Sequence, residues 1–102
     1  MPAEVHLNDI GTEFRATLKD QDGVVVDIST ASTRTMKFRK PTGVTVTKTA
    51  ALFGTGTDGK MKYLSITGDL DVLGEWRVQG FVAIGAGSWH TDEYRFTVHP
   101  TL

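Results

Sequence analysis

Residues 54–61, "GTGTDGKM", have the glycine and lysine spacing of a nucleotide-binding loop. In the phosphate-binding motif G-x-x-x-x-G-K-[ST], the backbone amides and the lysine hold phosphates, a Ser or Thr hydroxyl binds magnesium, and a helix follows. Here Met61 stands where the hydroxyl belongs, and the residues after Lys60, "MKYLSITGD", alternate as a strand does. The segment is therefore predicted to be a hairpin turn centred on Asp58 and Gly59, and no cofactor is expected.

Two further sets of residues could bind a metal ion. The run Asp20-Gln21-Asp22-Gly23 begins like a calcium loop, but Ala31 occupies the twelfth position, where such a loop has a glutamate. A hairpin turn is the favoured interpretation. His6, His90 and His99 lie far apart and lack zinc-site spacing, although strand ends could bring two of them together. The sequence predicts no metal site.

Acid–base and nucleophilic chemistry have little support in the sequence. Asp69 and Asp71 are close enough to form a carboxylate pair, but they flank Leu70 in a short connection, where aspartates usually accept local backbone hydrogen bonds. No serine lies in a G-x-S-x-G motif, and the chain has no cysteine. We therefore expect a protein that is not an enzyme.

Composition indicates one small globular domain over residues 1–102. Eleven basic and twelve acidic residues give a net charge of -1, so nucleic acid is not an expected partner. No apolar run is long enough to span a membrane, and residues 1–9 lack the features of a signal peptide. Residues 1–9 are instead predicted to be a flexible N-terminal arm, which frays or swaps onto a neighbouring copy.

Apolar residues alternate with polar ones along most of the chain, which predicts an all-β fold. Turn signals separate about seven antiparallel strands, as in an immunoglobulin-like β-sandwich. In "DLDVLGEWRVQGFV" a short turn leads into Trp76 and the longest strand. The strands are expected over residues 13–19, 24–28, 34–40, 44–52, 60–66, 75–84 and 94–98. The predicted core consists of Phe14, Leu18, Met36, Phe38, Tyr63, Trp76, Val78, Val82, Tyr94 and Phe96.

Four residues are candidates for contact with a partner. Trp89 is placed in a turn region after Gly87 and Ser88, where a large side chain has little core to enter, and His90 follows it on the expected loop. The outward side of the longest strand carries Arg77 and Phe81. Phe81 and Trp89 could form one interface patch.

The segments "DIGTEFRATLKDQDGVVVDISTAS", "KFRKPTG", "TDGKMKY" and "GDLDVLGEWRVQGFV" occur in an order that resembles the immunoglobulin-like domain of tailed-bacteriophage structural proteins, such as the N-terminal domain of the baseplate upper protein. The resemblance covers about residues 8 to 98. It implies a virion protein, synthesised in the host cytoplasm, that docks in several copies on other phage structural proteins. It carries over no catalytic residues.

The resemblance leaves the position in the particle open among tail, baseplate, neck and capsid surface, where the chain would be a decoration protein. A host-surface carbohydrate-binding module is another hypothesis, and it requires Trp89 and Phe53 to be exposed together. A nucleotide-dependent enzyme or switch is the third, supported only by the loop at residues 54–61.

Overall fold

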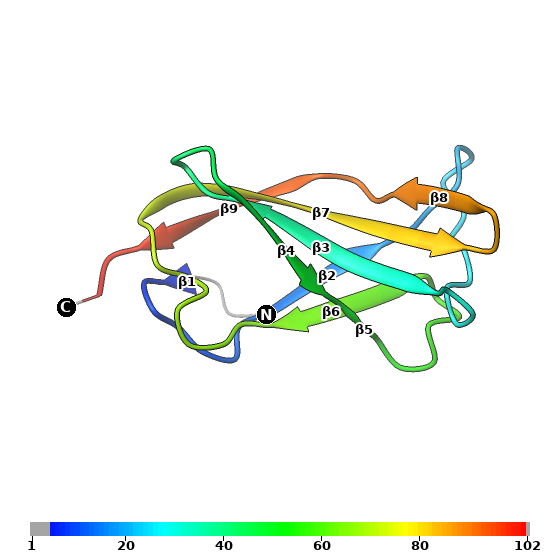
Figure 1. Ribbon diagram of the computed structural model, residues 1–102, viewed down its shortest axis with the longest axis horizontal. Coiled ribbons are helices and arrows are strands. Elements are labelled where there is room, and N and C mark those ends of the chain that lie inside the picture. Colours follow the sequence, from blue (N-terminus) through cyan, green and yellow to red (C-terminus); the bar gives the residue numbers. More distant parts are fainter. Residues whose placement is uncertain (1–4, 102) are drawn as a thin grey trace.

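The protein folds into two facing β-sheets, described here for residues 5–101 in a computed structural model (Figure 1). No helix occurs in that range, which confirms the all-β prediction. The larger sheet has the order β1-β9-β7-β3-β4, with β8 also paired to β7, and the smaller sheet has the order β2-β6-β5. The strands are β1 (Val5–His6), β2 (Glu13–Thr17), β3 (Thr33–Arg39), β4 (Thr45–Thr49), β5 (Ala51–Leu52), β6 (Lys60–Leu64), β7 (Gly74–Ile84), β8 (Gly87–His90) and β9 (Tyr94–His99).

Alternation of side chains determines which face of each strand meets the core. Along β7 the buried positions Trp76, Val78 and Val82 alternate with residues that are exposed or half-buried. In β2, Phe14 and Ala16 are buried in the same way. Because successive residues of a strand point to opposite faces, each sheet has an apolar inner face and a more polar outer face.

The core lies between the two sheets and draws residues from both. Of the residues expected there, seven are buried: Phe14, Leu18, Met36, Phe38, Trp76, Val78 and Val82. The other three are partly buried and pack against the core: Tyr63, Tyr94 and Phe96.

Aromatic rings join the two layers at the centre of the core. The Phe14 ring of the smaller sheet lies 5.1 Å from that of Phe38 and 4.8 Å from that of Phe96, both in the larger sheet. Phe96 in turn stacks on Trp76 with 5.8 Å between ring centroids. Each large aromatic side chain removes about 150–250 Å² from water, so this cluster is a main source of stability.

Trp76 fixes the corner through which the chain enters β7. Its ring is buried, and its indole Nε1–H donates a 2.9 Å hydrogen bond to the carbonyl of Val72, four residues upstream. The bond satisfies the only polar atom of the side chain, so the indole is buried without an unpaired donor.

Gly80 leaves a gap in the inner face of β7 that a side chain of the other sheet fills. A Cβ at this position would lie 2.2 Å from Cε of Met61, which is fully buried in β6. It would also lie 2.9 Å from Cγ2 of Thr91. Thr91 separates β8 from β9, and it pairs with Gly80 through its amide at 2.9 Å and its hydroxyl at 2.8 Å. The absence of a side chain here lets the two layers approach closely.

The count of seven strands, all antiparallel, is wrong. The described residues form nine strands, and β1 pairs with β9 in parallel, with Val5 opposite Val98. Residues 1–4 of the expected flexible arm lie outside the described residues. The rest of that arm includes β1, in which Val5 is buried. β1 lies at the edge of the larger sheet, beside β9.

Two further strand predictions need correction. Residues 24–28 form no strand and make a single bridge, Val25 with Lys19. The amide of Val26 bonds to Leu18 whereas that of Ile28 bonds to Gly56, so no continuous ladder develops. The strand expected over residues 44–52 divides at the buried Ala50, where the chain passes from the larger sheet to the smaller.

Replacing Gly80 by alanine should lower the free energy of unfolding by about 1–3 kcal/mol, because the added methyl overpacks the gap that Met61 fills. Urea denaturation followed by tryptophan fluorescence measures the change. In a Met61→Val background, the shorter side chain leaves room in the gap. Gly80→Ala should therefore lower the free energy of unfolding by less in this background than in the wild type. An equal loss of unfolding free energy in both backgrounds would show that Met61 does not fill the gap.

Candidate functional site

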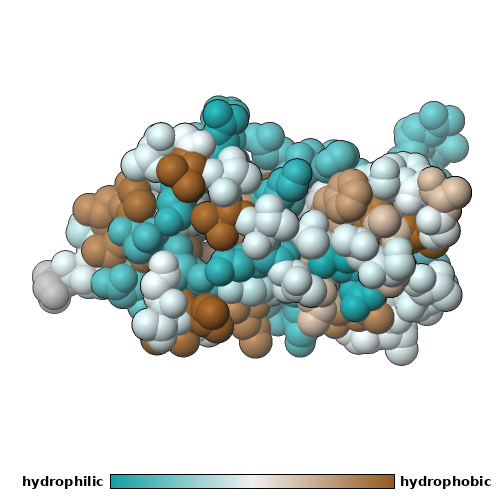
Figure 2. All heavy atoms as spheres, viewed as in Figure 1, coloured by the Kyte–Doolittle hydropathy of each residue, from teal (hydrophilic) through white to brown (hydrophobic). Residues whose placement is uncertain are grey.

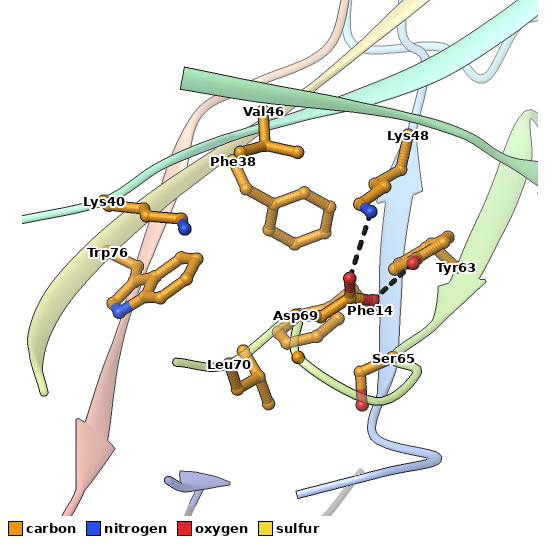
Figure 3. Close-up of a pocket in the computed structure, with 11 residues that line it drawn as sticks. Phe14, Phe38, Lys40, Val46, Lys48, Tyr63, Ser65, Asp69, Leu70 and Trp76 are labelled. Carbon is orange, nitrogen blue, oxygen red and sulfur yellow. Dashed lines mark hydrogen bonds and ion pairs between the residues drawn. The ribbon is translucent and has the colours of Figure 1, made fainter. Parts of the chain in front are cut away.

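A small cavity opens between the two sheets beside the aromatic cluster (Figure 3). Its volume is about 90 Å³, well below the ~300–1,000 Å³ of most small-molecule sites. Apolar rings form its floor, and charged side chains lie at its mouth. The lining residues are Phe14, Phe38, Lys40, Val46, Lys48, Tyr63, Ser65, Gly68, Asp69, Leu70 and Trp76.

Asp69 is the centre of a polar network at the mouth of this cavity. Its carboxylate lies 3.0 Å from Nζ of Lys48 on β4, and it accepts a short hydrogen bond from the hydroxyl of Tyr63 on β6 (Figure 3). The amide of Ile66 donates a third hydrogen bond at 2.9 Å. Lys48 belongs to the larger sheet and Tyr63 to the smaller, so this Lys48–Asp69–Tyr63 network connects the two layers.

The network determines the protonation states of its members. Burial alone raises the pKa of the Asp69 carboxyl, but the bonds from Tyr63, Ile66 and Lys48 outweigh burial and hold the pKa below its ordinary 3.8. Burial, followed by the bond to Asp69, raises the pKa of Tyr63 to about 12. At neutral pH the carboxylate is ionised and the phenol is protonated. Because three donors already occupy the carboxylate, it is poorly placed to take a proton from a substrate.

The predicted local role of the two aspartates is confirmed for Asp69, which accepts the amide of Ile66. Asp71 instead forms an ion pair with Lys40 at 2.9 Å, and its side chain is 44% exposed against 11% for Asp69. Leu70 between them is buried. The two carboxylates therefore bind separate lysines and do not form a pair.

The segment at residues 54–61 connects two antiparallel strands, β5 and β6, and a strand begins at Lys60, as predicted. Gly59 has a φ of 73°, and a Cβ there would lie 2.7 Å from the carbonyl oxygen of Val26 and 2.8 Å from that of Leu18. This glycine allows the backbone to approach two carbonyl groups closely. Carbonyl oxygens repel phosphate. The surroundings of Gly59 therefore differ from those of a phosphate-binding loop, in which backbone amides face the anion.

The turn predicted at residues 20–23 is present. One carboxylate oxygen of Asp20 accepts the amides of Asp22 at 2.9 Å and Val24 at 3.0 Å. The amide of Gly23 closes the turn on the carbonyl of Asp20. The carboxylate thus stabilises the turn, as is usual for an aspartate at this position.

Two histidines come together, as the sequence left open. His6 and His99 face each other in the β1–β9 pairing, with ring centroids 5.9 Å apart. His90 lies in β8. Within residues 5–101, no group of three or more His, Asp or Glu side chains is placed to hold a metal ion.

The four interface candidates divide between two faces of the larger sheet. Phe81 pairs with His90 across β7 and β8, and their rings lie 5.1 Å apart on the outer face, which Arg77 shares. Trp89 pairs with Val82, a core residue, and so points to the opposite face. A single patch of Trp89 with Phe81 is therefore wrong.

The local structure around Trp89 also differs from the expected turn. Residues 87–90 form strand β8, so Trp89 and His90 lie in a strand and the turn is confined to residues 85–86. Trp89 is 48% exposed, and its ring covers Gly87, where a Cβ would lie 2.2 Å from the indole. This ring provides an exposed apolar surface at the edge of the sheet.

Phe53, the other aromatic required for carbohydrate binding, is not free. The guanidinium of Arg15 lies over its ring at 4.3 Å, and the ammonium of Lys62 lies 5.8 Å from the ring centroid. A sugar that stacked on Phe53 would have to displace these cations. The arrangement gives the carbohydrate hypothesis no support.

Sequence reasoning missed a row of three arginines on the outer face of the larger sheet. Arg39, Arg77 and Arg95 are cross-strand neighbours in β3, β7 and β9. Each arginine lies at an outward position of its own strand, a signal that the sequence contains. The row also depends on strand pairing and register, which the sequence did not give.

No family model matches this chain, and no curated protein matches it significantly. Residues 5–101 also contain no helix of the length and hydropathy needed to cross a membrane.

Replacing Asp69 by asparagine should lower the free energy of unfolding at pH 7 by about 1–3 kcal/mol, because Lys48 loses a shielded partner. Asp71→Asn is the matched control in the same loop, and its exposed ion pair should contribute less than about 1 kcal/mol. Thermal or urea unfolding measures both changes.

The pH dependence follows from the lowered pKa of Asp69. A carboxyl whose pKa is lower in the folded state stabilises that state above its unfolded pKa, here near 3.8, and the contribution is lost as pH falls through the folded value. The difference between wild type and Asp69→Asn should therefore be constant near neutrality and shrink below about pH 4. A constant difference down to pH 2 would contradict this assignment.

Proposed function

We propose that this protein is a non-enzymatic structural component of a tailed-bacteriophage virion, an immunoglobulin-like module that docks on the tail, baseplate or neck through protein–protein contacts. The proposal rests on the order of turns and strands that resembles the phage domain, together with the two-sheet architecture. The observation that carries it is the Trp76 corner, in which a buried aromatic at the start of a long strand bonds to a carbonyl four residues upstream. Immunoglobulin-type folds use a similar aromatic corner.

The outer surfaces of the sandwich suit contacts between proteins. Figure 2 shows apolar side chains in separate groups, with polar side chains between them, on the face it presents. Contacts made through such a surface depend on hydrogen bonds and complementary charges as well as on apolar area. This pattern fits a folded module that docks on another protein.

If the proposal holds, particles purified by density gradient from cells that produce the phage should contain this chain at a constant number of copies per particle. Quantitative mass spectrometry measures the copy number, and immunogold labelling distinguishes the tail from the head. Labelling of the head surface would instead indicate a decoration protein. Recovery of the chain only from fractions without particles would contradict a virion role.

A further inference from the structure

The row of Arg39, Arg77 and Arg95 is set by the register of the larger sheet. Arg39 is directly opposite Arg77 in the β3–β7 pairing, and Arg77 is directly opposite Arg95 in the β7–β9 pairing. All three side chains are exposed on the outer face. Side chains that face each other on neighbouring strands have Cβ atoms about 4.5–5.5 Å apart. Three arginine side chains thus project from neighbouring positions on the same face of the sheet.

This placement opposes the stability of the free protein, because like charges directly opposite each other on a sheet repel. Two glutamates offset the repulsion in part: Glu93 lies 3.6 Å from Arg77, and Glu75 lies 3.5 Å from Arg95. Both pairs are about half exposed, so solvent screens them. Arg39 forms an ion pair with no carboxylate among residues 5–101.

Two hollows flank the Arg39–Arg77 pair. One, of about 350 Å³, is lined by both arginines with Lys40, Pro41, Gly43 and Glu75. The other, of about 160 Å³, is lined by both arginines with Lys37, Thr45, Val78, Gln79 and Glu93. Arg39 and Arg77 therefore line both depressions, each of which has room for a side chain of a partner. Lys37 adds a further cation without a carboxylate partner among the described residues.

We infer that this face, the arginine row with its two hollows, is the docking surface for an acidic protein segment whose carboxylates bind Arg39 and Arg77. The inference rests on the proposed function, which requires a protein partner. A planar guanidinium binds a carboxylate through two parallel hydrogen bonds, and the free charge of Arg39 favours such a ligand.

The charges around the row favour a protein over a nucleic acid. Glu75 and Glu93 lie among the arginines, and the whole chain has a net charge of -1. A continuous polyanion laid across the row would meet both glutamates, and few counterions would be released. A protein segment can place its carboxylates on Arg39 and Arg77 and avoid Glu75 and Glu93.

The first test measures whether the arginine row stabilises the folded protein. Arg39→Ser removes the arginine that has no described ion pair, so its thermal unfolding midpoint should equal or exceed that of the wild type at 20 mM salt, a low ionic strength chosen to limit screening. A clear fall in the midpoint would overturn the inference, because the row would then be structural.

The second test measures binding with a defined probe, a fluorescently labelled decaglutamate peptide, by anisotropy at the same ionic strength. The wild type should bind the peptide, and Arg39→Glu with Arg77→Glu should weaken binding at least tenfold. Lys19→Glu with Lys60→Glu is the control, since it makes the same change of charge on the smaller sheet and its adjoining turn. The control should change the dissociation constant less than threefold.

Three results would overturn the inference: no binding by the wild type, equal weakening in both double variants, or tighter binding of a ten-nucleotide DNA. The last result would assign the face to nucleic acid.

Particle incorporation separates this inference from the proposed function. If the wild-type chain is absent from particles, the virion role is contradicted. The docking surface is then tested by the peptide-binding result alone. Wild-type and Arg39→Glu/Arg77→Glu chains present at equal copy number contradict the docking surface alone.

Discussion

The packing of Phe14 against Phe38 and Phe96 is the interaction on which the rest of the structure depends. It brings a ring from the narrow three-stranded sheet between two rings of the wider sheet, and so closes the sandwich. The apolar face of a sheet has to be buried against another element, and the larger sheet covers that face of the smaller one. Phe14 therefore contributes much of the contact that covers the smaller sheet, and the Lys48–Asp69–Tyr63 network adds a polar connection beside it.

Once the sandwich is closed, the two faces of the larger sheet have different roles. The inner face carries Trp76, Val78 and Val82 and provides stability. The positions that alternate with them along β7 point to the outer face and include charged residues. Because β7 pairs on both sides, the backbone positions from which its outward side chains project are fixed. A surface that is ordered before binding loses little conformational entropy when a partner docks. The same alternation that builds the core thus prepares an ordered outer surface.

Sequence patterns predicted the features that depend on residues close together in the chain. The alternation around Phe14, Phe38 and Trp76 gave the main strands and most of the core, and the Asp-Gly pairs gave the turns. The parallel pairing of β1 was not predictable, because it depends on a strand more than ninety residues away in the chain. The passage between sheets at Ala50 left no signal beyond a run of suitable strand residues.

The candidate site shows the same division. Asp69 was recognised as a turn residue, but its partner Lys48 comes from a distant strand, and only the folded chain brings the two together. Trp89 was expected in a turn because glycines precede it, whereas a turn confined to residues 85–86 leaves it in a strand. Arg39 and Arg95 become neighbours of Arg77 only through register, which alternation within one strand does not specify.

Native-state hydrogen exchange tests the central claim, that the cross-sheet aromatic contact makes the two sheets a single cooperative unit. The account predicts that the slowest amides of β2 and β6 exchange with the same opening free energy as those of β3 and β7, because neither sheet stays folded alone. If β2 and β6 exchanged through a distinctly lower-energy opening while β3 and β7 stayed protected, the contact of Phe14 would not be what holds the sandwich together.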